Sequence, residues 1–203
     1  MKMGMFETWF MNTRAHNERM VSKCEHLLSF ANAGEGQKYL EVGCGNGTLC
    51  KHMVREYRMD VTGVDVAPDQ IERAQKDAED TPNLCFMVLD ATELPFDDAT
   101  FDIVLSSGVM HHIREWLDAL EEIARVLRPG GHFVYWDIIY AGWAAGWGES
   151  RLGRTLARAY GFPTLEGIES FKQRHGLRGL YATNPGTMLL PIHQYEAVYQ
   201  KPG

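Results

Sequence analysis

Three glycines at alternate positions follow a short apolar segment near residue 40. The sequence there reads Leu40-Glu41-Val42-Gly43-Cys44-Gly45-Asn46-Gly47-Thr48. Glycines spaced in this way let the chain turn tightly and let a ligand approach the backbone without interference from Cβ atoms. A helix that begins directly after the turn points its N-terminal N–H groups at that ligand. Two interpretations stay open, a ligand-binding loop and a glycine-rich turn that binds nothing.

The residues around these glycines narrow the class of ligand. A dinucleotide fingerprint G-x-G-x-x-G needs its third glycine where Thr48 stands, and the lysine of a triphosphate-binding loop is absent. The carboxylate of Glu41 would repel a pyrophosphate and attract a cation. The loop therefore favours a positively charged ligand over a nucleotide phosphate.

Two further acids follow apolar segments that have the character of strands. Asp65 stands near the end of the β-branched segment 61–66, and Asp90 follows the apolar run 84–89. A carboxylate at the first position can accept hydrogen bonds from a ribose diol, and one at the second can accept a hydrogen bond from an exocyclic amine. The alternatives are a helix cap for Asp65 and a turn residue for Asp90.

The elements that must position these acids alternate along the chain. We expect strands over residues 38–42, 61–66, 84–89, 101–106 and 132–139, and helices over 69–78 and around Leu117, Leu120, Ala124 and Leu127, the last closed by residues 128–131. Strands separated by helix-length crossovers predict a parallel sheet covered on both faces. In such a sheet the acids at successive strand ends lie along one edge, where open α/β folds bind ligands.

The two ends of the chain have a different character. Residues 14–33 carry an apolar helical face that ends in a glycine-rich turn. After a helix over 168–175 and a strand over 177–183, residues 193–200 alternate with period two. That alternation favours an antiparallel strand with one solvated side.

In this order and spacing the sequence resembles the class I S-adenosylmethionine-dependent methyltransferases. The matching runs are LEVGCGNGTL, GVDVAP, LDATELPFDDATFDIVLSSGVMHHI and ALEEIARVLRPGG, and they are most similar to the type 11 branch, which includes ubiquinone and menaquinone biosynthesis enzymes. The resemblance implies a Rossmann-like, doubly wound, mostly parallel seven-stranded α/β sheet whose C-terminal antiparallel strand lies between the fifth and sixth strands.

The resemblance also implies a role for each matching residue. The glycine loop would hold the methionyl and ribose parts of S-adenosylmethionine, with Glu41 at the cationic amino-acid end. Asp65 would bind the ribose hydroxyls and Asp90 the adenine amine, while Ser106 and Ser107 would lie against the methionyl group. The complete set of expected cofactor-binding residues is Glu41, Gly43, Cys44, Gly45, Gly47, Asp65, Val66, Asp90, Ala91, Ser106 and Ser107.

Methyl transfer from a sulfonium is an in-line displacement in which the cofactor carries the reactivity and the protein aligns the reactants. A base is needed only where the acceptor must lose a proton. The candidates are His111 and His112, whose alternative roles are to cap the next helix or contact the cofactor. Adjacent histidines point in different directions and no third ligand accompanies them, so we expect no metal site.

Residues 140–165 fit no strand and are expected to form an insertion at the acceptor pocket. Trp143 and Trp147 would share one helical face, and Arg151 and Arg154 would begin a basic stripe. One interpretation is a lid for an acidic small-molecule acceptor. The other is an ordinary amphipathic helix packed on the sheet. Whether O, N, C or S is methylated stays open.

Composition limits the remaining classes. Twenty Lys and Arg against 27 Asp and Glu leave a net charge of −7, which disfavours non-specific binding to nucleic acid or to an anionic membrane. Within this balance, residues 150–180 carry a net charge of +4. The uncharged stretch 138–148 is far shorter than the roughly 20 residues of a membrane span. Four cysteines without a CxxC pair and an acidic residue near the N-terminus favour a cytoplasmic protein.

We therefore predict a single domain over residues 1–203. It comprises an N-terminal helical segment (1–36), a cofactor-binding core (38–139), the insertion (140–165) and a C-terminal helix and strands (166–203). The predicted function is methylation of a small molecule. A protein that binds S-adenosylmethionine without catalysis is one alternative, and a nicotinamide-dependent oxidoreductase is another.

Overall fold

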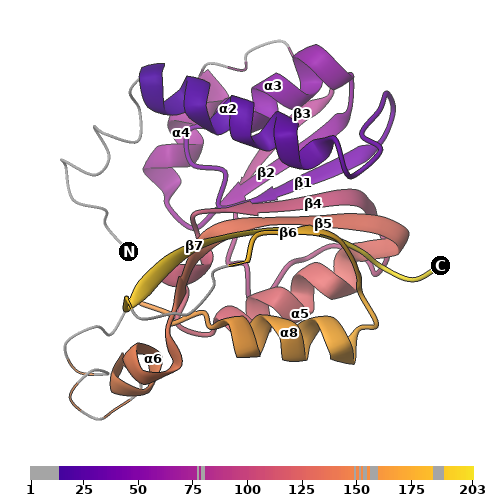
Figure 1. The fold of residues 1–203 in the computed structure, drawn as a ribbon. Helices are drawn as coiled ribbons and strands as arrows, with labels where there is room; N and C mark the ends of the chain where they lie inside the picture. Colours follow the sequence, from indigo (N-terminus) through magenta and orange to yellow (C-terminus); the bar gives the residue numbers. More distant parts are fainter. Residues whose placement is uncertain are drawn as a thin grey trace.

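The computed structural model describes residues 14–76, 78, 81–148, 150, 152, 155, 160–184 and 190–203. These residues form one seven-stranded sheet in the order β3-β2-β1-β4-β5-β7-β6 (Figure 1). The strands are β1 (Lys38–Val42), β2 (Asp60–Asp65), β3 (Leu84–Val88), β4 (Phe101–Ser107), β5 (Leu127–Tyr140), β6 (Arg178–Ala182) and β7 (Ile192–Gln200). The first five strands pair in parallel, and β7 pairs antiparallel with both β5 and β6. The predicted fold, including the antiparallel strand between the fifth and sixth, is confirmed.

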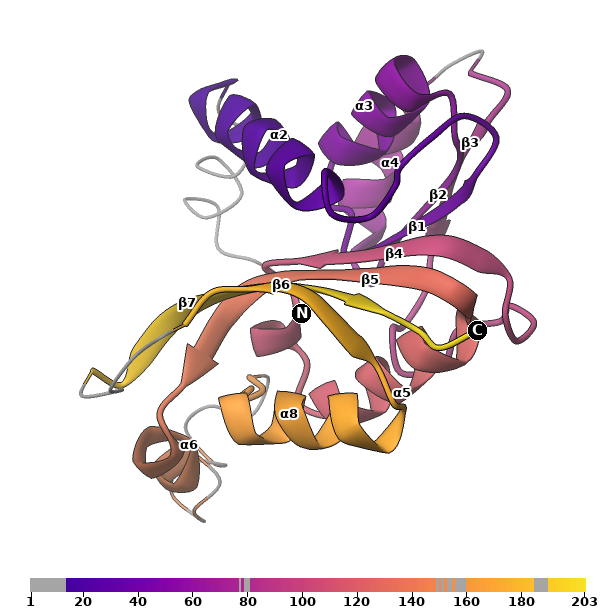
Figure 2. The ribbon, with the colours of Figure 1, turned by 45° about the vertical axis from the view of Figure 1, so that its right-hand side comes forward.

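Helices cover both faces of this sheet, as Figure 2 shows. On one face lie α2 (Arg14–Leu28), α3 (Thr48–Tyr57) and α4 (Pro68–Lys76), and on the other lie α5 (Trp116–Val126) and α8 (Leu165–Arg174). The short helix α6 (Gly142–Gly148) extends from the end of β5, and the single 3-10 turn η1 (Met110–His112) follows β4. The chain is therefore doubly wound. In such folds, ligands bind at the carboxyl ends of the parallel strands.

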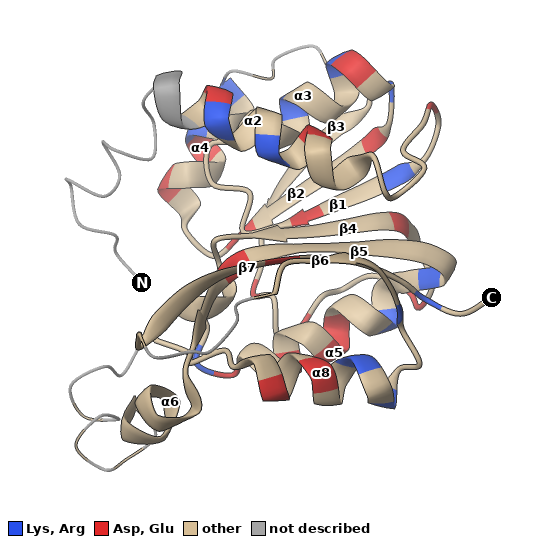
Figure 3. Ribbon diagram, in the orientation of Figure 1, with Lys and Arg blue, Asp and Glu red and all other residues tan. Residues whose placement is uncertain are grey.

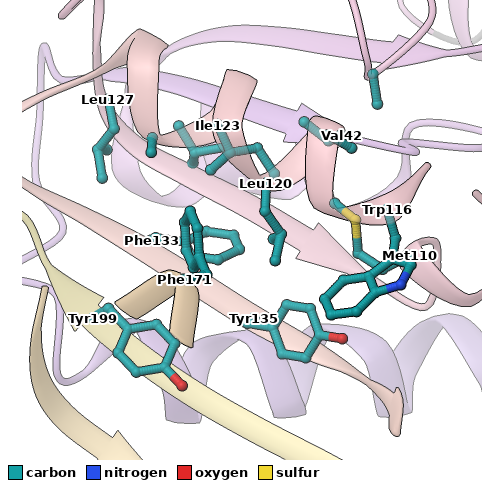
Figure 4. Close-up of a cluster of buried hydrophobic side chains, with 14 of the residues drawn as sticks. Val42, Met110, Trp116, Leu120, Ile123, Leu127, Phe133, Tyr135, Phe171 and Tyr199 are labelled. Atoms are coloured by element: carbon teal, nitrogen blue, oxygen red, sulfur yellow. The ribbon is translucent and has the colours of Figure 1, made fainter. Parts of the chain in front are cut away.

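The apolar side chains divide into two cores, one on each face. The core under α5 and α8 is built largely from aromatic and branched side chains, among them Leu120, Ile123, Phe133, Phe171 and Tyr199 (Figure 4). The core under α2, α3 and α4 includes three of the four cysteines, Cys24, Cys44 and Cys50, and all three are buried free thiols. The continuous apolar runs of the central strands are explained by burial on both sides.

The boundary between α5 and β5 differs from the sequence-based expectation. The helix ends at Val126, and Leu127 with residues 128–131 already belongs to β5 instead of to the helix and its closing turn. Gly130 adopts a φ of +76°, and it donates to the carbonyl of Lys201 over 3.0 Å, which aligns this segment with the end of β7. Leu117 is 40% exposed and lies off the buried stripe of α5.

The expected solvated side of the last strand is also wrong. The first residues of β7 are accessible, but the stretch from Tyr195 to Tyr199 is buried on both faces. Tyr195, Ala197 and Tyr199 pack in the core under α8, whereas Val198 packs in the other core. Glu196 lies on the second face beside Lys23 of α2, with Nζ and Oε1 2.5 Å apart. The period-two alternation marks two different buried environments, not a buried and a wet one.

Candidate functional site

The glycine loop between β1 and α3 adopts a backbone that excludes most side chains. Gly43, Gly45 and Gly47 have φ angles of +76°, +52° and +73°. A Cβ on Gly43 would lie 2.5 Å from a methyl of Val109, and one on Gly47 would lie 2.4 Å from the ring of Phe86. A Cβ on Gly45 would meet nothing within 4 Å. Two of the glycines are thus needed for packing, and the middle one presents bare backbone to open space.

Hydrogen bonds attach this loop to the end of β2. The N–H groups of Gly43 and Cys44 both donate to the carbonyl of Val64, over 2.8 and 2.9 Å. The N–H of Gly45 donates to Oδ2 of Asp65 over 2.9 Å, and Oδ1 of the same residue accepts from the N–H of Ala67 over 2.9 Å. Asp65 therefore joins the glycine loop to the start of α4. Asp65 also lines the cavity described next, so the hydrogen bond at the start of α4 is compatible with the predicted ligand-binding role.

A cavity of about 320 Å³ opens where β1, β2 and β3 end. Its walls combine acidic, apolar and glycine positions from four loops, namely Val42, Gly43, Val64, Asp65, Val66, Leu89, Asp90, Ala91, Thr92, Val109, His112, Ile113, Arg114 and Glu115. Five of the expected cofactor-binding residues, Gly43, Asp65, Val66, Asp90 and Ala91, thus meet in one hollow. Apolar walls with a few convergent carboxylates fit a ligand made of a flat ring and a diol.

Asp90 occupies a tight turn and the cavity wall at once. Its Oδ1 accepts from the backbone N–H and from the hydroxyl of Thr92, over 2.9 and 2.8 Å. Both hydrogen bonds fall on one oxygen, and they fix the orientation of the carboxylate. The neighbouring Ala91 is 8% exposed, and Val66 on the facing loop is 55% exposed. The turn interpretation is correct for Asp90, and it is compatible with a ligand-binding role.

Glu41 lies behind the glycine loop and not at the cavity wall. The residue is 3% exposed, and the thiol of Cys50 donates to its Oε2 over 2.8 Å. Burial removes the carboxylate from water and raises the pKa of Glu41 to about 8. A cation held at the loop would favour the ionised form of this acid.

The two serines lie at the carboxyl end of β4, outside the cavity wall. Ser106 pairs with Val42 in the sheet and is completely buried, and its hydroxyl has no hydrogen-bond partner among the described residues. Ser107 is 9% exposed. A buried hydroxyl without a partner beside the glycine loop is costly unless a ligand completes it, so its position suits a bound group.

The two histidines separate into different environments. His112 lines the cavity, whereas Nδ1 of His111 lies 2.5 Å from Oδ1 of Asp137 on β5. The two imidazole rings lie side by side, with their centroids 3.9 Å apart. Asp137 is a functional candidate that the sequence analysis missed. The available signal was one acid inside the otherwise apolar segment 133–139.

The insertion is described only in part. Trp143 and Trp147 share the exposed face of α6 and are 63% and 54% exposed. Arg151 and Arg154 lie outside the described residues. The helix itself carries no charged residue and is uncoloured for charge along its whole length in Figure 3.

The described part of the chain lacks both a metal cluster and a membrane span. Within it, no three His, Cys, Asp or Glu side chains lie close enough together to hold a metal ion. None of the helices in the described ranges is long and apolar enough to cross a bilayer.

Comparison with known proteins agrees with this geometry. Residues 40–135 match the family model described as a methyltransferase domain. The chain is 35% identical over 144 residues to a phthiotriol/phenolphthiotriol dimycocerosates methyltransferase of Mycobacterium leprae, which covers 68% of this chain and 53% of that protein. It is also 35% identical over 140 residues to a fatty-acid O-methyltransferase of Mycolicibacterium smegmatis, which covers 66% of this chain and 51% of that protein. The chain thus spans about half the length of the curated relatives it matches.

Solved structures share the fold at low sequence identity. The geranyl diphosphate C-methyltransferase of Streptomyces coelicolor superposes with a TM-score of 0.72 at 15% identity, over 89% of this chain and 78% of that one. A phosphoethanolamine N-methyltransferase of Haemonchus contortus superposes with a TM-score of 0.74 at 20% identity, over 90% of this chain and 52% of that one. Taken with the sequence matches, these findings show that residues 40–135 form a methyltransferase domain of the type 11 branch of the class I S-adenosylmethionine-dependent methyltransferases.

Proposed function

We propose that this chain transfers a methyl group from S-adenosylmethionine to a small-molecule acceptor. The observation that carries the proposal is the cavity at the carboxyl ends of β1, β2 and β3, where Asp65 and Asp90 face one hollow beside the bare backbone of the glycine loop. Among the described residues, no lysine lines this cavity, and the three carboxylates in its walls, Asp65, Asp90 and Glu115, outnumber its one guanidinium, Arg114, which lies 3.9 Å from Glu115. That combination suits a cationic adenosine derivative better than a nucleotide with several phosphates.

In this proposal, different residues bind different parts of the cofactor. Asp65 accepts from the ribose hydroxyls with the lone pairs that Gly45 and Ala67 leave unused, and Asp90 accepts from the adenine amine beside the Ala91 amide. The apolar side chains of Val66, Leu89 and Ile113 cover the faces of the ring. Gly45 and the hydroxyl of Ser106 lie toward the methionyl part, with Glu41 behind them.

When bound, the cofactor supplies an electrophilic methyl group on a positively charged sulfur. The protein then contributes alignment and exclusion of water. The sheet edge and the glycine loop hold one reactant in place, and the segment 110–115 with the insertion borders the approach of the other. We propose that the transfer is in-line, which requires the acceptor to enter from the side of η1 and the end of β5.

The described part of the acceptor side is apolar. Trp143, Trp147, Leu190 and Ile192 are exposed near the ends of β5 and β7, and the backbone N–H of Ala141 donates to the carbonyl of Pro191 over 3.0 Å. The curated relatives are named for fatty-acid and dimycocerosate substrates, which are largely apolar. We propose a small acceptor with an apolar part. The acidic group expected from Arg151 and Arg154 remains a prediction.

Titration calorimetry with S-adenosylhomocysteine and with NAD tests the proposal. We expect saturable binding of S-adenosylhomocysteine and none of NAD. Binding of NAD alone would overturn the assignment in favour of an oxidoreductase. Binding of S-adenosylhomocysteine without methyl transfer from a radiolabelled donor to any of a broad acceptor panel would indicate a binding protein without catalysis.

A further inference from the structure

Two exposed tryptophans lie on α6, the short helix that extends beyond the sheet from the end of β5 (Figures 1 and 2). Trp143 and Trp147 are four residues apart, so they share one face of the helix, and both are more than half exposed. The other face holds Ala145 and Gly148, which are buried. A Cβ on Gly148 would lie 2.4 Å from the ring of Phe162, so this face already has its packing partner. The two indoles are therefore directed away from the core.

The start of β7 adds two further exposed apolar side chains, Leu190 and Ile192. The N–H of Ala141, which directly precedes α6, donates to the carbonyl of Pro191 over 3.0 Å. This hydrogen bond brings the two segments side by side, and Figures 1 and 2 both show α6 near the start of β7. Four of the nine large apolar side chains that the described residues expose are thus gathered in one place. We call these four side chains, Trp143, Trp147, Leu190 and Ile192, the apolar tip.

The apolar tip carries no charge. Helix α6 contains no Asp, Glu, Lys or Arg, and it has no charged colour along its length in Figure 3. Beside the other segment, Nε2 of His193 donates to the carbonyl of Leu190 over 3.0 Å, so this ring is engaged with the backbone. The whole chain has a net charge of −7 and would be repelled by an anionic surface. In charge, the tip therefore fits a surface that is itself uncharged.

The size and composition of the apolar tip favour a lipid surface over a second copy of the chain. Its four side chains together expose roughly 500 Å², which is within the range of functional apolar patches. That area is smaller than the roughly 800 Å² that each partner buries in a stable protein–protein interface. Tryptophan is also enriched where the acyl chains of a lipid layer meet the headgroups, because its ring is apolar and its N–H donates a hydrogen bond.

We propose that the apolar tip docks on a lipid surface with uncharged headgroups. The tip lies at the carboxyl end of β5, and the cavity opens at the same edge of the sheet. After α6 the chain returns to this edge, where the N–H of Gly161 donates to the carbonyl of His111 over 3.1 Å. An acceptor with an apolar part then passes from the lipid to the cavity without crossing bulk water. That last step rests on the proposed function, whereas the docking itself does not.

Flotation of the full chain with vesicles of dioleoylphosphatidylcholine tests the docking. We expect the unmodified chain to float with the vesicles, and to do so equally at about 0.5 M NaCl, because salt screens only charged contacts. In the double variant Trp143→Ser with Trp147→Ser, the partition coefficient should fall by about tenfold or more, since most of the inserted apolar area is removed. Failure of the unmodified chain to float, or equal flotation of the variant, would overturn the proposal. So would binding that needs phosphatidylserine in the vesicles.

A second variant uses the other segment, so that the test does not depend on the folding of the first. Leu190→Gln with Ile192→Thr should lower the partition coefficient by about threefold or more. Val88→Thr is the matched control, because Val88 is 47% exposed on β3, which lies at the opposite edge of the sheet. This control should float as the unmodified chain does. An equal loss at Val88 would overturn the assignment of the docking to the apolar tip.

Two further measurements identify what covers the apolar tip. Phosphatidylcholine brominated on its acyl chains should quench the tryptophan fluorescence of the unmodified chain, and it should quench that of the double tryptophan variant much less. Light scattering without lipid should give the mass of a monomer for both proteins. A dimer that the variant dissociates would assign the tip to a second copy and overturn the proposal. Absence of S-adenosylhomocysteine binding to the unmodified chain would overturn the proposed function, whereas the flotation result would still decide the docking.

Discussion

Asp65 accepts hydrogen bonds from two separate parts of the chain while it faces the cavity. One oxygen holds the N–H of Gly45, and the other holds the N–H of Ala67. Each carboxylate oxygen can accept a further hydrogen bond, so the same side chain can shape the loop and bind a diol. The effect of a substitution at Asp65 must therefore be measured both on the folding stability and on the affinity for the ligand.

We predict that Asp65→Asn weakens binding of S-adenosylhomocysteine by about 1–3 kcal/mol, because a charge-assisted hydrogen bond to the ribose is lost. Titration calorimetry measures the affinity, and urea denaturation reports any loss of folding stability. Asp60→Asn is the control, since Asp60 lies exposed at the opposite end of the same strand. An affinity equal to that of the unmodified chain would contradict the ribose assignment.

The buried side chain of Glu41, behind the glycine loop, makes the free energy of unfolding depend on pH. Burial raises the pKa of this acid from its ordinary value of 4.5 to about 8, so between these values the folded chain holds a proton that the unfolded chain has lost. The free energy of unfolding therefore declines as the pH rises from about 4.5 to about 8. A cation bound at the loop would reduce this decline, because it would stabilise the ionised form of Glu41 in the folded chain.

We expect Glu41→Gln to remove this dependence. Between pH 5 and pH 8.5, the unfolding free energy of the unmodified chain should decline by about 2 kcal/mol or more relative to that of the variant. Urea denaturation at several pH values measures the difference. Glu35→Gln, at a side chain that is 71% exposed, should keep the pH dependence of the unmodified chain. Parallel curves for Glu41→Gln and the unmodified chain would show that this acid is not responsible.

Within the loop between β1 and α3, some glycines are required by the packing of neighbouring side chains, whereas Gly45 leaves space for a ligand. Gly45 and Gly47 both have positive φ, but a Cβ would meet the Phe86 ring only from Gly47. Substitution of either by alanine costs about 1–2 kcal/mol for the left-handed backbone alone. Only at Gly47 does overpacking add to that cost, typically by about 1–3 kcal/mol.

We predict that Gly45→Ala lowers the affinity for S-adenosylhomocysteine by about tenfold or more at a modest loss of stability, because the new methyl group occupies the space left to the ligand. Gly47→Ala should instead destabilise the fold more strongly. Gly36→Ala is the matched control, since Gly36 has φ +77° and a Cβ added there would meet nothing within 4 Å, but it lies in another loop. Calorimetry and urea denaturation on the three variants measure both quantities. Equal affinities for Gly36→Ala and Gly45→Ala would contradict a ligand at the loop.

At the scale of the whole molecule, the order of strands and helices was predictable because the parallel core alternates buried apolar runs with helical stripes. The end of α5 was not, since the stripe of apolar residues continues through Leu127 while a tertiary pairing of β5 with β4 and β7 begins there. The burial of both faces of β7 was also missed. A period of two distinguishes the two faces of a strand but not what covers them.

The residues of the candidate site also divide into those that the sequence predicted and those that it did not. Gly43, Asp65 and Asp90 were found because each stands at or just beyond the carboxyl end of a strand, and parallel strands bring such positions together. Asp137 was missed because it lies within a strand, and its partner His111 is brought to it only by the turn after β4. The burial of Glu41 behind the loop also depends on side-chain direction in β1, which a motif alone does not specify.

Ligand binding should therefore protect one edge of the molecule. At a concentration of S-adenosylhomocysteine about 100 times its Kd, the folded state gains about 2.7 kcal/mol. Hydrogen exchange should slow in the cavity segments, residues 43–47, 65–66, 90–92 and 110–115, while β6 is unaffected. NAD at equal concentration is the control and should change nothing. A second hollow between α2 and α3 is lined by Lys51, His52 and Arg55. Protection confined to that hollow would contradict the proposed function. The ligand would then lie away from Asp65 and Asp90, the acids that should bind the adenosine.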